Sequence, residues 1–265
     1  MTTPESRTTL IRVPQITAYF WLVKILTTGA GETTSDYLGH KIGAAAVVIA
    51  GILAMAISFV LQFRMRRYVA WAYWLAVSMV AIFGTMAADA MHAIGLNYTR
   101  STAAFAVILG LIFLAWYSVE KTLNIHSITT ARREAFYWAT VLATFALGTA
   151  AGDLTASSFG WGYLKSGVRF TVAIVIVGAG YMASKRVRDG GGAIESASTV
   201  MWFWLAYILT RPLGASFADW MGAGTRRGGL GWGDGPVSVV LWVIIIGLVW
   251  YLNVTRSDVQ TAQEA

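Results

Sequence analysis

No cysteine occurs anywhere in the 265-residue sequence. This absence excludes a disulfide framework, a thiolate metal site and a redox-active pair of thiols. Charged residues are scarce too, at 12% of the chain, whereas soluble globular domains carry about 25%. A soluble domain of ordinary composition is therefore excluded.

Signals of processing and of common enzyme chemistry are missing as well. The first dozen residues are polar, and no small-residue cleavage site follows a short apolar core, so we expect no removable signal peptide. The chain has no His-Glu-x-x-His, no Gly-x-Ser-x-Gly and no phosphate-binding glycine loop followed by lysine. The Gly-x-Gly-Asp string of intramembrane aspartyl proteases occurs in "GWGDG" (231–235), but in a predicted loop and without a Tyr-Asp partner. We expect no enzymatic activity and no permanently bound cofactor.

Apolar sequence fills most of the chain. Apolar residues make up 57% of it, and the mean hydropathy is +0.60. Runs of about 20 apolar residues recur from end to end, each long enough to cross a hydrocarbon core of roughly 30 Å as a helix. Helices are required because an open strand edge cannot satisfy its backbone hydrogen bonds in lipid. The sequence predicts an all-α, polytopic membrane protein embedded in the lipid bilayer.

We expect eight membrane helices, at residues 14–38, 43–63, 69–94, 101–119, 133–158, 167–184, 198–222 and 236–254. Lysine and arginine in the connections predict the orientation, because they concentrate on the cytoplasmic side. The side that holds both termini has twelve of them and the other side has six, so both termini should be cytoplasmic. This topology signal explains the net charge of +7, and no nucleic-acid partner is expected. The twelve are Arg7, Arg12, Arg64, Arg66, Arg67, Lys121, Arg132, Arg133, Lys185, Arg186, Arg188 and Arg256.

Four of the predicted spans carry one motif, as internal repeats do. They read "FWLVKILTTGAGETTSD" (20–36), "YWLAVSMVAIFGTMAAD" (73–89), "YWATVLATFALGTAAGD" (137–153) and "FWLAYILTRPLGASFAD" (203–219). Each has Phe or Tyr, then Trp, nine residues, Gly, four residues and Asp. The motif residues are Trp21, Trp74, Trp138 and Trp204; Gly31, Gly84, Gly148 and Gly214; and Asp36, Asp89, Asp153 and Asp219.

Each repeat contains two helices, at about 14–63, 69–119, 133–184 and 198–254, so all four repeats share one orientation. Repeats of this kind are related by an axis along the membrane normal. We expect one membrane domain over residues 1–265, with the repeats around a pseudo-fourfold axis. A monomer of this design encloses an axis of its own, so oligomerisation is not required to form a site.

The two helices of a repeat differ in polarity. The apolar parts of the second helices, 43–63, 101–119, 170–184 and 236–254, contain no Asp, Glu, Lys or Arg. We therefore expect the first helices to line a polar interior and the second helices to face lipid. The motif glycines would let neighbouring first helices approach closely. The motif tryptophans, about 22 Å from the aspartates along each helix, are expected mainly as anchors at the cytoplasmic interface.

The motif aspartates are the strongest candidate site, because ionisable residues at membrane depth are costly and are usually functional. Their common spacing predicts one layer in the outer half of the membrane, and Glu32, one helical turn before Asp36, adds a fifth carboxylate. Lys24 and Arg211 lie in the same helices, so five negative and two positive charges leave a net charge of −3. Such a site calls for cations. We predict Asp36, Asp89, Asp153, Asp219 and Glu32 as ion ligands, the four aspartates being the metal ligands.

Other side chains are expected to support these acids. Thr28 is one of several hydroxyl groups in the same helices, and oxygen ligands suit magnesium, manganese or calcium. His40 and His92 follow two of the motif aspartates by four and three residues, and imidazole beside carboxylate favours manganese or a heavier metal. Arg211 lies deep enough to pair with a carboxylate, while Lys24 either supports the site or extends to the cytoplasmic surface.

The fourfold two-helix unit and its motif tryptophan resemble a bacterial membrane family known as a repeat of unknown function, with four tandem repeats per protein. The opening helix, "VPQITAYFWLVKILTTGAGETTSDYL", is closely similar to that of the family, and the resemblance covers nearly the whole chain. It implies eight spans and a bacterial inner membrane. It implies no particular activity, and repeats two to four lack the glutamate of "GETTSD".

The residues favour a secondary transporter of a hard divalent cation, with manganese as the expected ion. Transport would be proton-coupled through Glu32, because two carboxylates that close favour protonation of one. Export is the expected direction. Two alternatives stay open. An organic-cation exporter would use aromatic side chains at the depth of the acids, where only Trp161 and Trp220 are suitable. A non-transporting scaffold or sensor would use the acids to lock the helices together.

Overall fold

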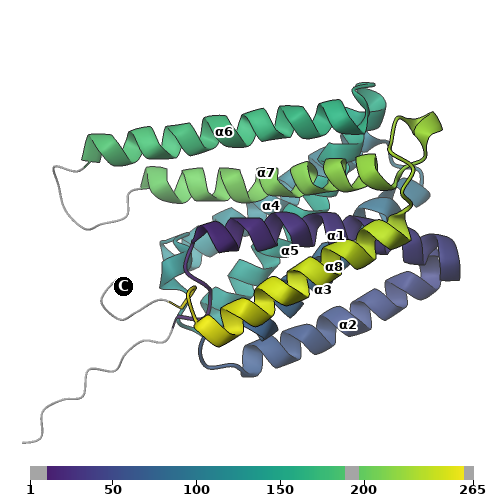
Figure 1. The fold of residues 1–265 in the computed structure, drawn as a ribbon. Helices are drawn as coiled ribbons and strands as arrows, with labels where there is room; N and C mark the ends of the chain where they lie inside the picture. Colours follow the sequence, from purple (N-terminus) through teal and green to yellow (C-terminus); the bar gives the residue numbers. More distant parts are fainter. Residues whose placement is uncertain (1–10, 189–196, 260–265) are drawn as a thin grey trace, which may run out of the picture.

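The computed structural model describes residues 11–188 and 197–259, and within these ranges the chain is all-α, as predicted. Eight α-helices follow one another, with short connections where both ends are described (Figure 1). Single turns η1 (Ile125–Ser127) and η3 (Thr225–Arg227) and a π-helical segment η2 (Leu154–Ser158) complete the described elements. The helices are α1 (Ala18–Ile42), α2 (Ala44–Arg64), α3 (Ala70–Ala93), α4 (Tyr98–Glu120), α5 (Ala131–Asp153), α6 (Gly162–Arg188), α7 (Ala197–Gly222) and α8 (Asp234–Thr255).

The predicted spans correspond one to one with these helices, and the boundaries differ by up to five residues. α1 begins at Ala18 rather than at residue 14, because residues 11–17 form an extended segment that bonds to other parts of the chain. Thr17 caps the helix by accepting a hydrogen bond from the Phe20 amide. α6 begins at Gly162 rather than at residue 167, directly after a turn in which Gly160 and Gly162 have positive φ.

Six of the eight helices are long and apolar enough to cross a membrane, which makes this a membrane protein. They are α2 to α6 and α8. The other two, α1 and α7, have 25 and 26 residues and are the helices that carry Lys24, Glu32, Asp36, Arg211 and Asp219. These two helices, which are not among the six, pack against each other.

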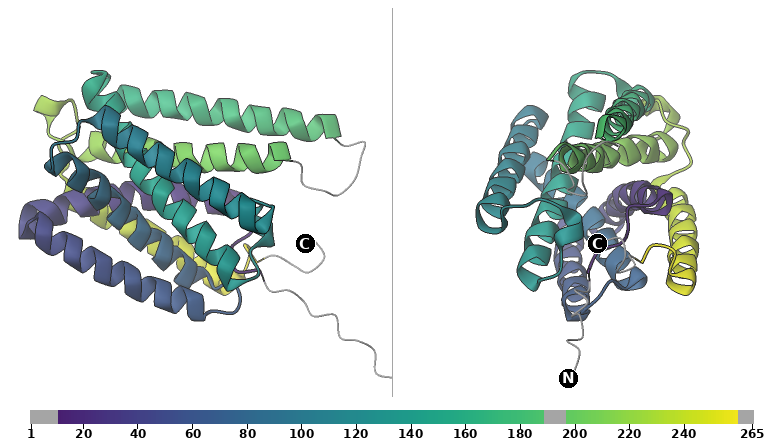
Figure 2. Two further views of the ribbon diagram at one scale, coloured as in Figure 1. Left: turned by 180° about the vertical axis from the view of Figure 1, so that it is seen from behind. Right: turned by 90° about the vertical axis from the view of Figure 1, so that its left-hand side faces the viewer.

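The odd-numbered helices form the interior and the even-numbered helices surround them, as the end-on view of Figure 2 illustrates. α1 contacts α3 and α7, and α5 also contacts α3 and α7, so the four first helices close on one another. Each even helix packs chiefly on the odd helix that follows it, and α8 packs on α1. About two thirds of the apolar window of α3 and α5 is buried, against about a fifth for the even helices, as their polarity predicted.

The motif glycines lie where one odd helix meets the next, which confirms the close approach predicted for them. A Cβ added to Gly31 on α1 would lie 2.6 Å from the Cβ of Ala81 on α3. One added to Gly84 on α3 would lie 2.6 Å from the Cβ of Phe145 on α5. Gly148 meets Arg211 and Pro212 on α7 in the same way, and Gly214 meets Ile25 and Thr28 on α1. Only glycine fits these positions without moving a helix.

Three of the four motif tryptophans do not behave as interfacial anchors, which corrects that expectation for them. Trp74, Trp138 and Trp204 are all at most 4% exposed, because they pack with the motif Phe or Tyr of other repeats, whereas Trp21 is partly exposed. The hydroxyls of Tyr73 and Tyr137 form a hydrogen bond of 2.5 Å in this cluster. An aromatic cluster thus fills the bundle at the end where the odd helices begin, which we call the tryptophan end. The opposite end, where the motif aspartates lie, is the carboxylate end.

Residues 11–17, which we call the N-terminal strap, run across the tryptophan end. The Arg12 amide donates to the carbonyl of Ile128, the Tyr68 amide donates to Ile11, and the Gln15 amide donates to Asp258. The strap therefore ties together the links before α3 and α5 and the segment after α8. Arg7, one of the residues used for the predicted orientation, lies outside the described residues.

The segment after α8 is held by Asp258, whose carboxylate accepts a hydrogen bond from the Tyr68 hydroxyl. Burial raises the pKa of Asp258 above its usual value, so the folded protein holds this proton more tightly than the unfolded chain. The resulting stability is present at low pH and is lost as pH rises through the raised pKa. We expect Asp258→Asn to flatten this part of the dependence of unfolding free energy on pH. An unchanged slope in the variant would contradict the assignment.

Candidate functional site

A fully buried arginine joins all four central helices. Arg211 on α7 directs its Nη2 atom at three acceptors, each 2.5 Å away. These are the Glu32 carboxylate on α1, the Thr85 hydroxyl on α3 and the Thr149 hydroxyl on α5. The Arg211 side chain has no exposed surface and that of Glu32 is 6% exposed. The pairing of Arg211 with a carboxylate, expected from its depth, is confirmed.

The three acceptors occupy equivalent places in the repeats. Glu32, Thr85 and Thr149 each lie eleven residues after the motif tryptophan of their own repeat, and the fourth repeat has Ala215 there. Arg211, seven residues after Trp204 and one helical turn before Ala215, bonds from the fourth repeat to all three of these side chains. One layer of the internal repeat has thus become asymmetric, with one acid, one base and two hydroxyls.

Two motif aspartates join Glu32 in a first carboxylate cluster. One carboxylate oxygen each from Glu32, Asp36 and Asp219 lie within 4.8 Å of one another, which is close enough for a single ion to bind all three. Glu32 and Asp36 come from α1, one turn apart, and Asp219 comes from the last turns of α7. Oxygen ligands of this kind suit hard cations. We call these three residues the α1–α7 triad.

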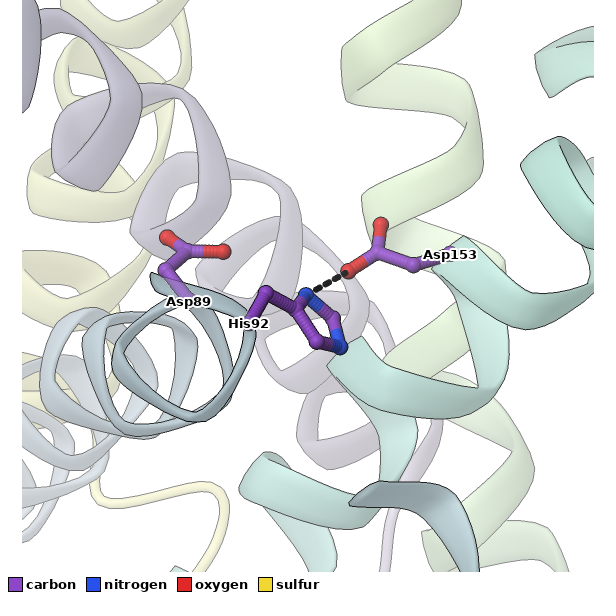
Figure 3. Close-up of side chains that lie close together, drawn as sticks. All are labelled: Asp89, His92 and Asp153. Carbon is purple, nitrogen blue, oxygen red and sulfur yellow. Dashed lines mark ion pairs between the residues drawn. The ribbon is translucent and has the colours of Figure 1, made fainter. Parts of the chain in front are cut away.

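The other two aspartates form a second cluster with a histidine. Asp89 and His92 on α3 and Asp153 on α5 also place one ligand atom each within 4.8 Å of one another. Figure 3 shows the imidazole between the two carboxylates, with His92 Nδ1 4.0 Å from Asp153 Oδ2. The other ring nitrogen, Nε2, lies 2.9 Å from the Ser101 hydroxyl, which fixes the ring orientation. We call these residues the α3–α5 triad, and its Asp89 is exposed.

The single layer of five carboxylates that we predicted is therefore divided in two. The aspartates of α1 and α7 meet on one side of the bundle and those of α3 and α5 on the other. Both triads lie at the carboxylate end, and together they hold five carboxylates. The carboxylate end therefore holds an excess of negative charge, of which Arg211 neutralises one.

Lys24 lies inside the protein and does not extend to the surface, which corrects that alternative. It is 1% exposed, and its Nζ lies 3.7 Å from the centre of the Tyr207 ring and 4.6 Å from that of Phe145. Within the described residues the ammonium has these aromatic faces but no hydrogen-bond acceptor. It precedes Glu32 by eight residues, or about 12 Å along α1, on the side of the tryptophan end.

Two predicted supporting residues bond to the backbone instead of to the acids. The Thr28 hydroxyl donates to the carbonyl of Ile25, at 2.6 Å, where α1 packs against α7. His40 is exposed, and its Nδ1 lies 2.7 Å from the carbonyl oxygen of Asp36 rather than from its carboxylate. His92 is thus the histidine that the structure brings to the aspartates, and Thr85 and Thr149 are the hydroxyls that it brings to Glu32 and Arg211.

A second buried ion pair, which the sequence did not indicate, lies at the tryptophan end. Glu134, in the first turn of α5, has no exposed surface and accepts from Arg12 Nη1 of the strap at 2.6 Å. It also accepts from Gln62 Nε2 at 2.8 Å and from the motif residue Trp138 at 3.4 Å. The only signal in the sequence is a glutamate four residues before a motif tryptophan, which is common in helices. This cluster locks the strap onto α2 and α5.

Comparison with family models gives one match, to a repeat of unknown function (DUF347), at residues 19–68, 72–122, 136–187 and 202–258. The chain belongs to this repeat family. Each matched segment contains one odd helix, from about its motif tryptophan, and the even helix that follows. No match was found among curated proteins or among solved structures.

Comparison of the four repeats with one another shows which residues differ between them. All four DUF347 repeats keep the tryptophan, the glycine and the aspartate, whereas the buried charges Lys24, Glu32 and Arg211 belong to the first and the fourth. These are the two repeats whose odd helices, α1 and α7, lie side by side. The charged residues that the other repeats lack therefore lie at the contact between the first and last repeats.

Proposed function

We propose that the protein is a proton-coupled transporter of a hard divalent cation, manganese being the ion to test first, in a bacterial inner membrane. In this proposal all eight helices span the membrane as four parallel repeats around a pseudo-fourfold axis. Both termini and the tryptophan end face the cytoplasm, and the carboxylate end faces outward. The helices α1 and α7, which carry buried charges, can span because the apolar helices α8 and α6 pack along them.

The observation that carries the proposal is the α1–α7 triad. Three carboxylates from two central helices converge within 4.8 Å, and in the described part of the chain neither aspartate has an ion-pair partner. Acids at membrane depth are costly unless they have a function. A divalent cation between them would neutralise the charge that Arg211 leaves, with hard oxygen ligands of the kind that manganese, magnesium and calcium accept.

The same charge balance suggests how protons are exchanged. Arg211 neutralises Glu32 when no cation is bound, so the two remaining negative charges belong to Asp36 and Asp219. Two protons on these aspartates balance the site without a cation, and a divalent cation replaces both. The α3–α5 triad, more exposed and containing His92, would receive or release the cation at the outer mouth.

The closed tryptophan end supports alternating access. The aromatic cluster and the N-terminal strap cover the central helices there, while Asp89 is exposed at the other end. This arrangement fits an outward-open state, from which a cation reaches the α1–α7 triad from outside. The organic-cation alternative loses one of its two tryptophans, because the Arg169 guanidinium covers the Trp161 ring at 3.9 Å.

The proposal is tested by manganese flux into liposomes that contain the purified protein, a manganese-quenched dye and a pH dye. We expect uptake driven by an outward proton gradient, with opposite movement of protons. Asp36→Asn and Asp219→Asn each remove one ligand of the triad and should reduce the flux at least tenfold. Asp258→Asn, the same change at the tryptophan end and outside both triads, should leave it within twofold of the unaltered protein.

Three outcomes would count against the proposal. No saturable binding of manganese, magnesium or calcium by calorimetry would exclude the cation site. If only tetraphenylphosphonium binds, the organic-cation alternative is correct. If nothing binds and the aspartate variants unfold at lower temperature, the acids lock the helices together, as in the scaffold alternative.

A further inference from the structure

Glu32 belongs to two groups at once. One of its oxygens lies 2.5 Å from Arg211 Nη2, and its carboxylate is also the deepest member of the α1–α7 triad. Arg211 therefore occupies the place of a positive charge beside the triad before any cation arrives. A cation at the triad and the guanidinium beside it would repel each other, because both lie in a poorly solvated interior where charges interact strongly.

We propose that Arg211 is an internal competitor of the transported cation for Glu32, and that this exchange links cation binding to movement of α7. The inference rests on the proposed function and adds the residue that couples the site to the protein. In the empty site Arg211 holds Glu32. In the occupied site Glu32 turns to the cation, and the guanidinium keeps only its two threonine partners.

The hydrogen bonds of Arg211 suit an exchange better than a permanent lock. All three bonds run through Nη2, and two of them go to the hydroxyls of Thr85 and Thr149, which remain when Glu32 leaves. Nε and Nη1 are buried but have no partner among the described residues. A purely structural buried arginine is expected to use its five donors on fixed acceptors, since each unpaired donor costs free energy.

Lys24 limits where the displaced charge can go. It is buried about two turns closer to the tryptophan end than Glu32. Its Nζ lies 4.6 Å from the centre of the Phe145 ring, and the Arg211 guanidinium carbon lies 5.7 Å from the same centre, so the two positive charges are near each other and repel. The Arg211 guanidinium thus lies between a cation at the triad and the Lys24 ammonium on the side of the tryptophan end. Moving the Arg211 side chain alone towards the tryptophan end does not relieve the repulsion, so the helix that carries it is expected to move.

The backbone of α7 is weakest at this residue. Pro212, directly after Arg211, lies inside the helix and has no N–H to donate to the carbonyl four residues earlier. Kinks and hinges in helices occur at such prolines. A push on Arg211 is therefore applied beside the position where α7 bends most easily, and α7 also carries Asp219 of the triad.

The test is manganese affinity, measured by calorimetry on detergent-purified full-length protein with Arg211→Gln, Glu32→Gln and the double variant. Removal of the competitor should raise the affinity of Arg211→Gln at least about fivefold, a typical lower bound for coupled sites. Glu32→Gln should weaken binding. In the Glu32→Gln background, Arg211→Gln should raise the affinity less than it does in the unaltered protein, because competition for the carboxylate is then absent and only the direct repulsion of the cation remains. Arg132→Gln, an exposed arginine of α5 paired with Glu120, is the matched control and should change nothing.

The outcomes separate this inference from the proposed function. No binding by the unaltered protein refutes the cation site itself. Binding by the unaltered protein with equal or weaker affinity in Arg211→Gln refutes the competition alone, as does a gain in affinity that is just as large without Glu32.

A second measurement uses the unaltered protein, in case Arg211→Gln does not fold. Saturating manganese should increase amide hydrogen exchange in α7 around residues 208–214, because Arg211 loses its hold on α1. The exchange in α4 serves as the internal reference, since it carries no triad residue. Unchanged or slower exchange around Pro212 on manganese binding would overturn the inference.

Discussion

Arg12→Ala should lower the free energy of unfolding by about 3–5 kcal/mol, the range for breaking a buried ion pair by removing one partner. The substitution leaves Glu134 fully buried, and among the described residues Gln62 and Trp138 remain as its side-chain donors. It also releases the N-terminal strap, whose backbone bonds to Ile128 and Tyr68 then lack their side-chain anchor. Unfolding in mixed detergent micelles, followed by tryptophan fluorescence, measures the loss.

The matched control is Arg132→Ala on the same helix as Glu134. Arg132 also donates to a glutamate, Glu120, at 2.5 Å, but its side chain is 69% exposed. Exposed ion pairs contribute little because water already solvates both groups. The loss for Arg132→Ala should therefore be much smaller than that for Arg12→Ala.

The double variant separates the ion pair from the strap. Arg12→Met with Glu134→Leu removes both charges and should recover much of the stability, since paired apolar replacements of a buried ion pair are often neutral. Equal losses for Arg12→Ala and Arg132→Ala would mean that burial of Glu134 is not what makes the strap important.

The internal repeat made most of the fold predictable. Four copies of one motif fixed the number of helices, and the lack of charge in the second helices predicted which ones would lie outside. The motif glycines predicted the helix contacts for a simple steric reason, since a helix can approach another closely where a side chain is missing. These features are local and repeat in each unit, so the sequence alone displays them.

The sequence predicted which residues gather at the candidate site, but not how they are arranged there. Spacing along a helix gives the depth of a side chain but not the neighbouring helix that it faces, so five acids at one end became two triads. The pairing of Glu32 with Arg211 joins residues 179 positions apart and depends on which repeats are neighbours. The sequence placed both residues in the interior, and the closure of α7 onto α1 made them partners.

Burial of Lys24 was not predictable for a different reason. A lysine in the first half of a predicted membrane span often extends to the surface along its own alkyl chain. Here the aromatic cluster fills the space on that side, and the rings of Tyr207 and Phe145 receive the ammonium. The composition of the neighbouring helices, rather than the position of the lysine, determined its direction.

Gly31→Ala should be among the most damaging single-methyl additions in the protein. The new Cβ would lie 2.6 Å from the Ala81 Cβ and 2.8 Å from the Ala81 carbonyl carbon, and a backbone atom of α3 cannot rotate away. α1 and α3 must separate, which loosens the contact one residue before Glu32. Overpacking of a close contact typically costs about 1–3 kcal/mol, which exceeds the gain of up to about 1 kcal/mol that alanine offers in a helix. The same unfolding assay measures the loss.

Gly110→Ala on α4 is the control, because it adds the same methyl group to a helical glycine with no heavy atom within 4 Å of the new Cβ. It should leave stability unchanged or slightly higher. Gly84→Ala should resemble Gly31→Ala, since its Cβ would meet the Phe145 Cβ at 2.6 Å in the next contact around the bundle. If all three variants were equally stable, the odd helices would not pack so closely that only glycine fits at their contacts. The layer that aligns Glu32, Thr85 and Thr149 around Arg211 would then lose its structural basis, because this layer lies one residue beyond the motif glycines of their helices.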